Sequence, residues 1–211
     1  MRNALLLVFL LLPAVALAYH YGPGQDRLRA DDAARLVARG RESAERAREA
    51  ARAEGDEAAR DLWAESEAAY SEALPLLSDA EPGAARGARL ERAKAWMFLS
   101  RLPEARAEFE RLVEEMAADP GADAAQLRDA RAALAESRFY MTWLLRLEGA
   151  SREEWEPEID AARQGYKLLH EEAAANGDDR LASASRENLE AAVRLARLDL
   201  SELQGLPLPS Q

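Results

Sequence analysis

Residues 100–109 read SRLPEARAEF, and this stretch decides the fold because its proline stands between two helix-periodic sequences. Pro103 has no amide hydrogen, and its fixed φ suits the first turn of a helix, where that hydrogen would have no partner. We therefore expect a tight turn over residues 100–102, preceded by a helix over about 84–100 and followed by a returning helix over 103–118. Two helices joined in this way form an antiparallel hairpin.

Helical periodicity extends well beyond this hairpin. It begins near Leu28 and continues along the chain, with few β-branched residues and no alternating, strand-like run. The stretch Ala38–Asp61 has no large apolar side chain, so we expect a helix that packs shallowly through alanine or frays into solvent. Further helices are expected over residues 62–77, 123–148, 151–175 and 178–203. The sequence therefore predicts an all-α fold with one helical domain over residues 26–203.

Local signals mark several helix ends. Ser151, followed three residues later by Glu154, is a capping-box pattern. Asn176-Gly177 is typical of a helix C-cap. The glycines and the proline of YHYGPGQ predict an irregular segment over residues 19–25, before the first helix.

The N-terminal residues 1–18 have the pattern of a signal peptide. Arg2 precedes the apolar run Ala4–Leu12, and Ala16-Leu17-Ala18 is a small-x-small cleavage signature. The run is shorter than the ~20 apolar residues that span a bilayer. We expect cleavage near Ala18/Tyr19, a periplasmic or secreted protein, and no stable membrane insertion afterwards. An uncleaved N-terminal anchor is the alternative.

Composition narrows the classes of partner. The chain has no cysteine, so it has no disulfide framework and no lipid-bearing cysteine. Its 39 acidic and 28 basic residues give a formal net charge of −11. Nucleic-acid affinity depends on clustered cations that neutralise phosphates, so this balance predicts no nucleic-acid partner.

The sequence offers few groups for acid–base or metal chemistry. Its two histidines are His20 and His170, and the string HEEAA at 170–174 lacks the second histidine of a zinc-protease motif. After cleavage, Tyr19-His20 could chelate copper(II), although a loose terminus is the simpler interpretation. Four glutamates between positions 153 and 158 offer oxygen ligands for calcium, but helix starts favour acids in any case. We predict no catalytic, cofactor-binding or metal-binding residues, with an unrecognised hydrolase as the enzymatic alternative.

Three predicted helices share one pattern: a small residue, an aromatic residue four positions later, and an apolar residue or alanine three positions after that. The sets are Ser66-Tyr70-Ala73, Ala105-Phe109-Leu112 and Ala162-Tyr166-Leu169. The pattern resembles the second helix of the tetratricopeptide repeat, and Ala93 and Trp96 match the small and aromatic positions of that family's first helix. Arg92 and Ser100 stand where leucine and glycine are usual. The sets are spaced more widely than the ~34-residue period of the family, and an irregular helical bundle is the alternative architecture.

The resemblance implies stacked antiparallel hairpins, forming an α-solenoid whose first helices line a concave face that holds extended peptides. The equivalent positions here combine aromatic rings with guanidinium groups, which are typical of binding hot spots. They are Arg89, Arg92, Trp96, Tyr140, Trp143 and Arg146. For each of the three aromatic residues, however, helical spacing favours burial in the core over a place on the binding face. The lysines and asparagines with which family members clamp a peptide carboxylate are not reproduced, so recognition of peptide C-termini is not implied.

The C-terminal segment QGLPLPSQ, residues 204–211, cannot continue the last helix because of its glycine and alternating prolines. Leu206, Pro207, Leu208 and Pro209 could form a polyproline-like docking segment, used against the last hairpin or against a partner. A loose chain end is the alternative.

The leader, the hairpin pattern and the lack of catalytic motifs together predict a function. We expect a non-catalytic scaffold that binds a protein or peptide partner outside the cytoplasm. A structural or self-assembling helical protein is the alternative.

Overall fold

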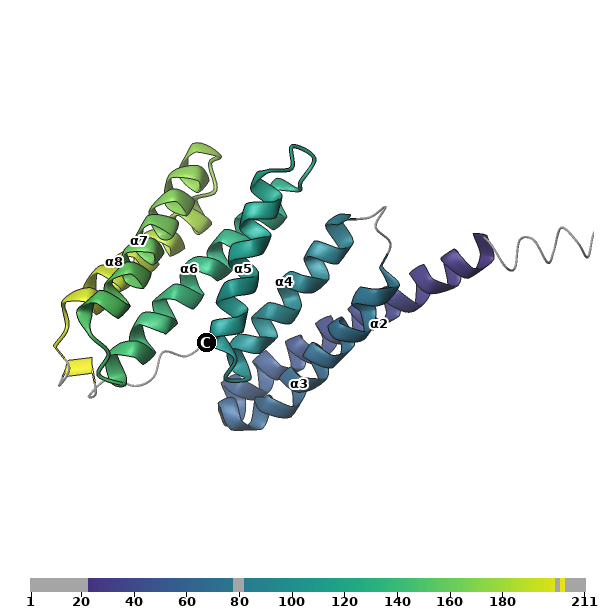
Figure 1. Ribbon diagram of the computed structural model, residues 1–211, viewed down its shortest axis with the longest axis horizontal. Coiled ribbons are helices and arrows are strands. Elements are labelled where there is room, and N and C mark those ends of the chain that lie inside the picture. The colour runs from purple at the N-terminus through teal and green to yellow at the C-terminus, as the bar shows by residue number, and fades with distance from the viewer. Residues whose placement is uncertain (1–22, 78–81, 200–201, 204–211) are drawn as a thin grey trace, which may run out of the picture.

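The computed structural model describes residues 23–77, 82–199 and 202–203. Within them the chain forms seven α-helices and one 3-10 turn and contains no strand. In chain order these are α2 (Pro23–Glu54), α3 (Asp56–Ala73), η1 (Leu74–Leu76), α4 (Pro82–Phe98), α5 (Leu102–Ala117), α6 (Ala124–Leu147), α7 (Arg152–Ala175) and α8 (Asp179–Arg197). Each helix packs mainly against its neighbours in sequence, which gives a row of antiparallel hairpins (Figure 1). The all-α prediction and the hairpin stacking are confirmed.

The tight turn around Ser100 joins α4 to α5. Helix α5 begins at Leu102, so Pro103 lies in its first turn as predicted. The amide of Arg101 donates to the carbonyl oxygen of Trp96 at 3.0 Å, which closes the end of α4. Ser100 has φ 61 and is the one non-glycine residue with positive φ in the described chain. That backbone region favours glycine, which explains why serine is an unusual residue in this turn.

Other helix ends also follow the local signals. The amide of Ser151 donates to Oε2 of Glu154 at 2.8 Å, in a complete capping box at the start of α7. Gly149 (φ 77) and Gly177 (φ 72) lie in the turns after α6 and α7. Their left-handed conformation is the one that commonly terminates helices.

The N-terminal boundaries differ from the prediction. Helix α2 begins at Pro23, so residues 23–25 are helical rather than irregular. This agrees with the preference of proline for the first turn of a helix. The segment 38–61 is helical except at Gly55. This residue has a φ of 96 and separates the end of α2 from the start of α3. The predicted signal peptide and the C-terminal docking segment lie outside the described residues.

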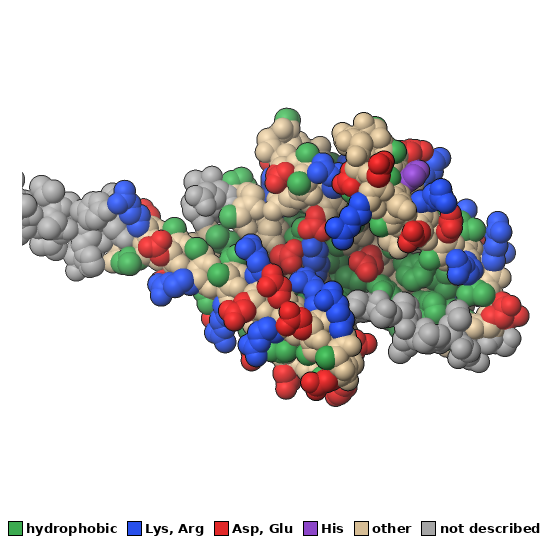
Figure 2. All heavy atoms as spheres, turned by 180° about the vertical axis from the view of Figure 1, so that it is seen from behind, with side chains coloured by type: hydrophobic (Ala, Val, Ile, Leu, Met, Phe, Trp, Pro, Cys, Tyr) green, Lys and Arg blue, Asp and Glu red, His purple; other side chains and the backbone are tan. Residues whose placement is uncertain are grey.

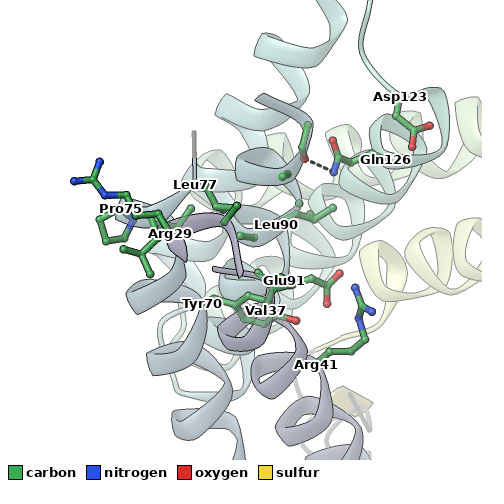
Figure 3. Close-up of a pocket in the computed structure, with 18 of the residues that line it drawn as sticks. Arg29, Val37, Arg41, Tyr70, Pro75, Leu77, Leu90, Glu91, Asp123 and Gln126 are labelled. Atoms are coloured by element: carbon green, nitrogen blue, oxygen red, sulfur yellow. Dashed lines mark hydrogen bonds between the residues drawn. The ribbon is translucent and has the colours of Figure 1, made fainter. Parts of the chain in front are cut away.

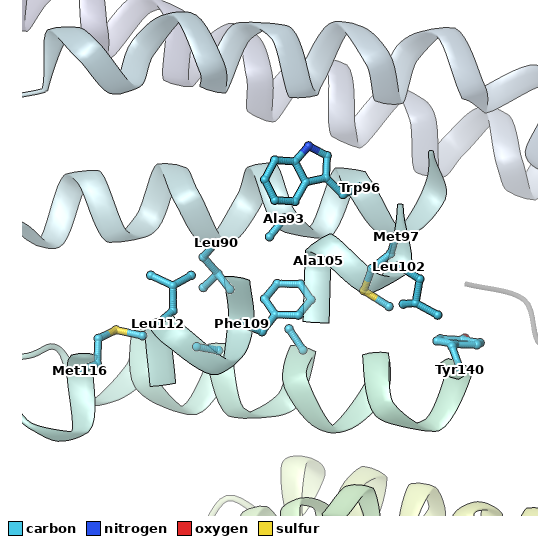
Figure 4. Packing of buried hydrophobic residues seen from close by; sticks show 12 residues of the cluster. Leu90, Ala93, Trp96, Met97, Leu102, Ala105, Phe109, Leu112, Met116 and Tyr140 are labelled. Atoms are coloured by element: carbon cyan, nitrogen blue, oxygen red, sulfur yellow. The ribbon is translucent and has the colours of Figure 1, made fainter. Parts of the chain in front are cut away.

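Large side chains form two adjoining cores. In the first, Phe109 packs among Leu90, Leu112 and Met97 between α4, α5 and α6 (Figure 4). In the second, α6, α7 and α8 enclose Ile159, Tyr166, Leu169 and Leu195, among others. All nine residues of the three repeated small–aromatic–apolar sets are buried. No described helix is long and apolar enough to cross a membrane.

The first hairpin is packed differently, through small residues. Ala44, Ala47 and Ala59 are buried between α2 and α3. The hydroxyl of Ser66 donates to the carbonyl oxygen of Gly40 at 2.8 Å. A Cβ atom placed on Gly40 would lie 2.9 Å from Cε2 of Tyr70, so the helix backbone rests directly against that ring.

Candidate functional site

The predicted partner-binding residues on α4 do not form a free surface. Nε of Arg89 donates to Oε1 of Glu108 at 2.6 Å, and its Nη1 donates to Oε2 of Glu115 at 2.7 Å. The guanidinium of Arg92 lies over the ring of Trp96, with Cζ 4.7 Å from the ring centroid. Trp96 itself is buried. This part of α4 therefore faces α5 and the end of α3.

The predicted residues on α6 are also largely internal. Tyr140 belongs to the first core and Trp143 to the second. The guanidinium of Arg146 donates to the backbone carbonyl oxygens of Leu195 and Leu198 and lies over Trp155, with Cζ 4.8 Å from its centroid. It therefore binds the carbonyl groups left free at the C-terminal end of α8. Trp96, Tyr140 and Trp143 are buried, as their helical spacing indicated, so they do not line an exposed face.

A groove that the prediction missed lies between α2, η1, α4 and α6. Its volume is about 1100 Å³. Val37 of α2, Tyr70 of α3, Leu77 after η1 and Leu90 of α4 supply its apolar lining (Figure 3). Alanines 30, 34, 84 and 88 widen it, because their short side chains leave space above the helix backbones.

The groove exists because the first two helices differ in length. Helix α2 has 32 residues and α3 only 18, so the N-terminal half of α2 continues past its partner. Figure 1 shows this end of α2 extending beyond the hairpin row. Ala30, Ala34, Val37 and Arg41 recur at helical spacing and line one side of the opening. Leu74 and Pro75 of η1 close one end, where the chain leaves α3.

The rim of the groove carries both signs of charge. Arg29 and Arg41 stand on the α2 side. On the opposite side Nζ of Lys94 donates to Oε1 of Glu91 and to Oδ2 of Asp129, both at 2.8 Å. Burial opposes the charged form of Lys94, but the two carboxylates hold its pKa above the usual value. Acidic and basic side chains also alternate over the face seen in Figure 2.

The groove lining holds no histidine, serine, threonine or cysteine among the described residues. Nδ1 of His170 contacts the carbonyl oxygen of Ala182 at 2.8 Å, which joins α7 to α8. The glutamates near the start of α7 also have local partners: Glu154 caps the helix, Glu156 accepts from Arg152 and Glu158 pairs with Arg106 at 3.3 Å. The described residues contain no group of three or more acidic or histidine side chains placed to hold a metal ion.

The groove could be anticipated only in part from the sequence. The small-residue stripe at positions 30, 34 and 37 indicates a helix face that is neither charged nor filled by large side chains. Whether this face borders a groove or packs against another helix depends on the length of α3 and on the course of the chain through η1. No local sequence pattern specifies either of these. Comparison with known protein families, curated proteins and solved structures gave no match, and the site is therefore interpreted from its own residues.

Proposed function

We propose that this protein is a non-catalytic scaffold that binds a peptide segment of a partner protein outside the cytoplasm. The observation that carries the proposal is the open groove between α2, η1, α4 and α6, with an apolar lining and a charged rim. Concave, mostly apolar sites with a few polar groups at their edge are typical of ligand recognition. The location rests on the leader pattern of residues 1–18.

The groove favours recognition through side chains. Its walls are helices whose backbone groups bond within the helix, so an extended strand has no sheet edge to join. A partner would instead place apolar side chains against Val37, Leu77 and the ring of Tyr70. Polar or charged groups of the partner would then face Arg29 and Arg41 on one side and the Lys94 cluster on the other.

A likeness to tetratricopeptide-repeat modules is part of the same proposal. Each repeated set lies on the second helix of a hairpin, α3, α5 or α7, and its small, aromatic and apolar members are buried together. Small residues allow two helices to approach closely, and the aromatic residue then fills the space toward the next hairpin. These placements support the likeness at three separate positions along the chain.

The test is selection of peptides from a displayed random library with the chain from Tyr19 onward. A selected peptide is then titrated against Ala34→Trp, which fills the groove, and against Ala53→Trp. Both alanines are exposed on α2, but only Ala34 lines the groove. We expect a Kd at least about tenfold weaker for Ala34→Trp and unchanged for Ala53→Trp. Selection of no peptide, or equal weakening by both variants, would contradict the proposal.

A self-assembling helical protein is the second candidate. Leu144 of α6 and Leu168 of α7 are 42% and 41% exposed, which is unusual for leucines on packed helices. If these positions mediate assembly, light scattering should show a mass that rises with concentration, and Leu144→Glu with Leu168→Glu should abolish the rise. A constant monomer mass in both proteins would exclude this candidate.

A further inference from the structure

The acidic residues that line the groove between α2, η1, α4 and α6 already have roles within the fold. Glu91 and Asp129 each accept from Nζ of Lys94 at 2.8 Å. Asp123 caps α6, because its Oδ1 accepts from a backbone amide of the first turn at 2.8 Å. Asp26 lies in the first turn of α2, where the helix dipole stabilises a carboxylate.

The two arginines of the same lining have no such role. Arg29 and Arg41 are exposed on α2, and neither forms an ion pair or a hydrogen bond within the described part of the chain. A guanidinium carries five N–H donors and no acceptor, so these two side chains are available to an anion. The charges of the groove therefore complement a partner segment that is acidic along the edge facing α2.

The hydroxyl of Tyr70 offers a further donor beside Arg41. Tyr70 is only 1% exposed, and its hydroxyl bonds to no described residue, yet this oxygen is not enclosed and opens onto the groove. Figure 3 shows the guanidinium of Arg41 and the carboxylate of Glu91 on the side of the groove to which the hydroxyl points. Burial raises the pKa of Tyr70, Glu91 raises it further and Arg41 lowers it, so both charges act on this hydroxyl.

Glu91 does not use these donors, because its carboxylate bonds to Lys94 instead. The second bond of Lys94, to Asp129, holds this cluster on the α4 and α6 side of the groove. The two cations Arg41 and Lys94 balance the two carboxylates of Glu91 and Asp129. A carboxylate that enters the groove therefore meets neutral surroundings with unused donors. It accepts through both oxygens, which suits a guanidinium and a hydroxyl together.

We propose that the groove binds an acidic segment of the partner protein, with one aspartate or glutamate carboxylate held by the guanidinium of Arg41 and the hydroxyl of Tyr70. This inference rests on the peptide-binding function proposed above. Apolar side chains beside the held carboxylate contact Val37 and Leu77. Arg29 lies about 18 Å farther toward the N-terminus of α2. A second acidic residue, about five positions away in an extended segment, reaches it.

The probes are two displayed libraries of short random peptides that differ only at one central position, fixed as glutamate in one and as glutamine in the other. Both are selected against the chain from Tyr19. We expect the best glutamate binders to be at least about tenfold tighter than the best glutamine binders, and to be weakened by Ala34→Trp. Equally tight binders from both libraries, weakened by Ala34→Trp, would overturn acidic recognition and leave the peptide-binding function intact. Binders from neither library would overturn both.

Variants locate the bound carboxylate. Arg41→Gln should weaken the glutamate peptide at least about tenfold and remove its advantage over the same peptide with glutamine. Tyr70→Phe keeps the ring but removes the hydroxyl, and it should weaken the glutamate peptide about tenfold with little effect on the glutamine peptide. Arg39→Gln removes an exposed arginine of α2 outside the groove lining and should change neither Kd. Unchanged binding by Arg41→Gln, or equal weakening by Arg39→Gln, would disprove the site.

Discussion

The first hairpin and the middle of the protein achieve close packing in opposite ways. Between α2 and α3 the facing residues are mostly small, such as Ala44, Ala47 and Ala59, and the two large buried side chains, Trp63 and Tyr70, both come from α3. The helix backbone at Gly40 touches the ring of Tyr70. Around α5 the space between helices is filled by Phe109, Leu112 and Met116. In the first region stability depends on how closely two backbones approach, and in the second on how much volume the side chains fill.

The comparison predicts opposite sensitivities to mutation. Removal of side-chain volume should affect the middle of the protein most, because it leaves a cavity and forfeits apolar burial. Addition of volume should affect the first hairpin most, because its helices would have to separate.

The largest expected effect is that of Phe109→Ala. Phe109 is fully buried in the first core, so its truncation should cost about 3–5 kcal/mol of unfolding free energy. Denaturant unfolding followed by circular dichroism measures this loss. The matched change in the first hairpin, Ala47→Gly, should cost only about 1 kcal/mol, the helix-propensity difference. Equal losses would remove the distinction between the two regions.

The reverse change tests the first hairpin directly. Ala47 is fully buried, so Ala47→Leu should destabilise the protein by about 1–3 kcal/mol through overpacking. Ala38→Leu, at an exposed position of the same helix, serves as the control and should have little effect. A stable, unperturbed Ala47→Leu protein would show that α2 and α3 can separate without cost.

Alkaline pH should also weaken the first hairpin. Burial, with a smaller contribution from Glu91, raises the pKa of Tyr70 from its ordinary value of 10.0 to about 12. The unfolded chain therefore releases this proton at lower pH than the folded protein. The stabilisation is fully present below pH 10 and is lost as the pH rises toward 12.

The change attributable to Tyr70 should reach up to about 2 kcal/mol. The measurement is denaturant unfolding at several pH values for the original protein and for Tyr70→Phe. Tyr140 and Tyr166 also have raised pKa values because of burial, so only the difference between the two proteins reports on Tyr70. Parallel pH profiles would show that ionisation of Tyr70 is not linked to folding.

The smallest expected effects on stability are those of two glycine-to-alanine substitutions, one destabilising and one stabilising. Gly40→Ala adds a Cβ within 2.9 Å of the Tyr70 ring and should destabilise the protein by about 1 kcal/mol, despite the better helix propensity of alanine. Gly83→Ala in α4 meets no atom within 4 Å and should stabilise it by about 0.5 kcal/mol. Thermal unfolding of the two variants under identical conditions gives the comparison. The same sign for both would mean that the close approach at Gly40 is unimportant.

The sequence predicted most of the fold because its signals are local. Pro103, the Ser151–Glu154 capping box and the repeated aromatic sets each act within one or two helical turns. The site was less predictable because helical spacing favours burial of Trp96, Tyr140 and Trp143 but does not show which helices cover them. The partners that engage Arg89 and Arg146 come from α5 and α8, far along the chain. The groove depends on the difference in length between α2 and α3, and neither helix sequence alone shows that difference.

The contact between Gly40 and Tyr70 also sets the register of the first hairpin. An interface made of alanines has few features that distinguish one alignment from the next. Sliding α2 by one turn, about 5.4 Å, would bring Leu36 or Ala44 opposite the ring in place of Gly40 and would break the hydrogen bond from Ser66. The missing side chain at Gly40 thus fixes the alignment of α2 along α3. It thereby fixes how much of the N-terminal end of α2 extends past α3 to border the groove.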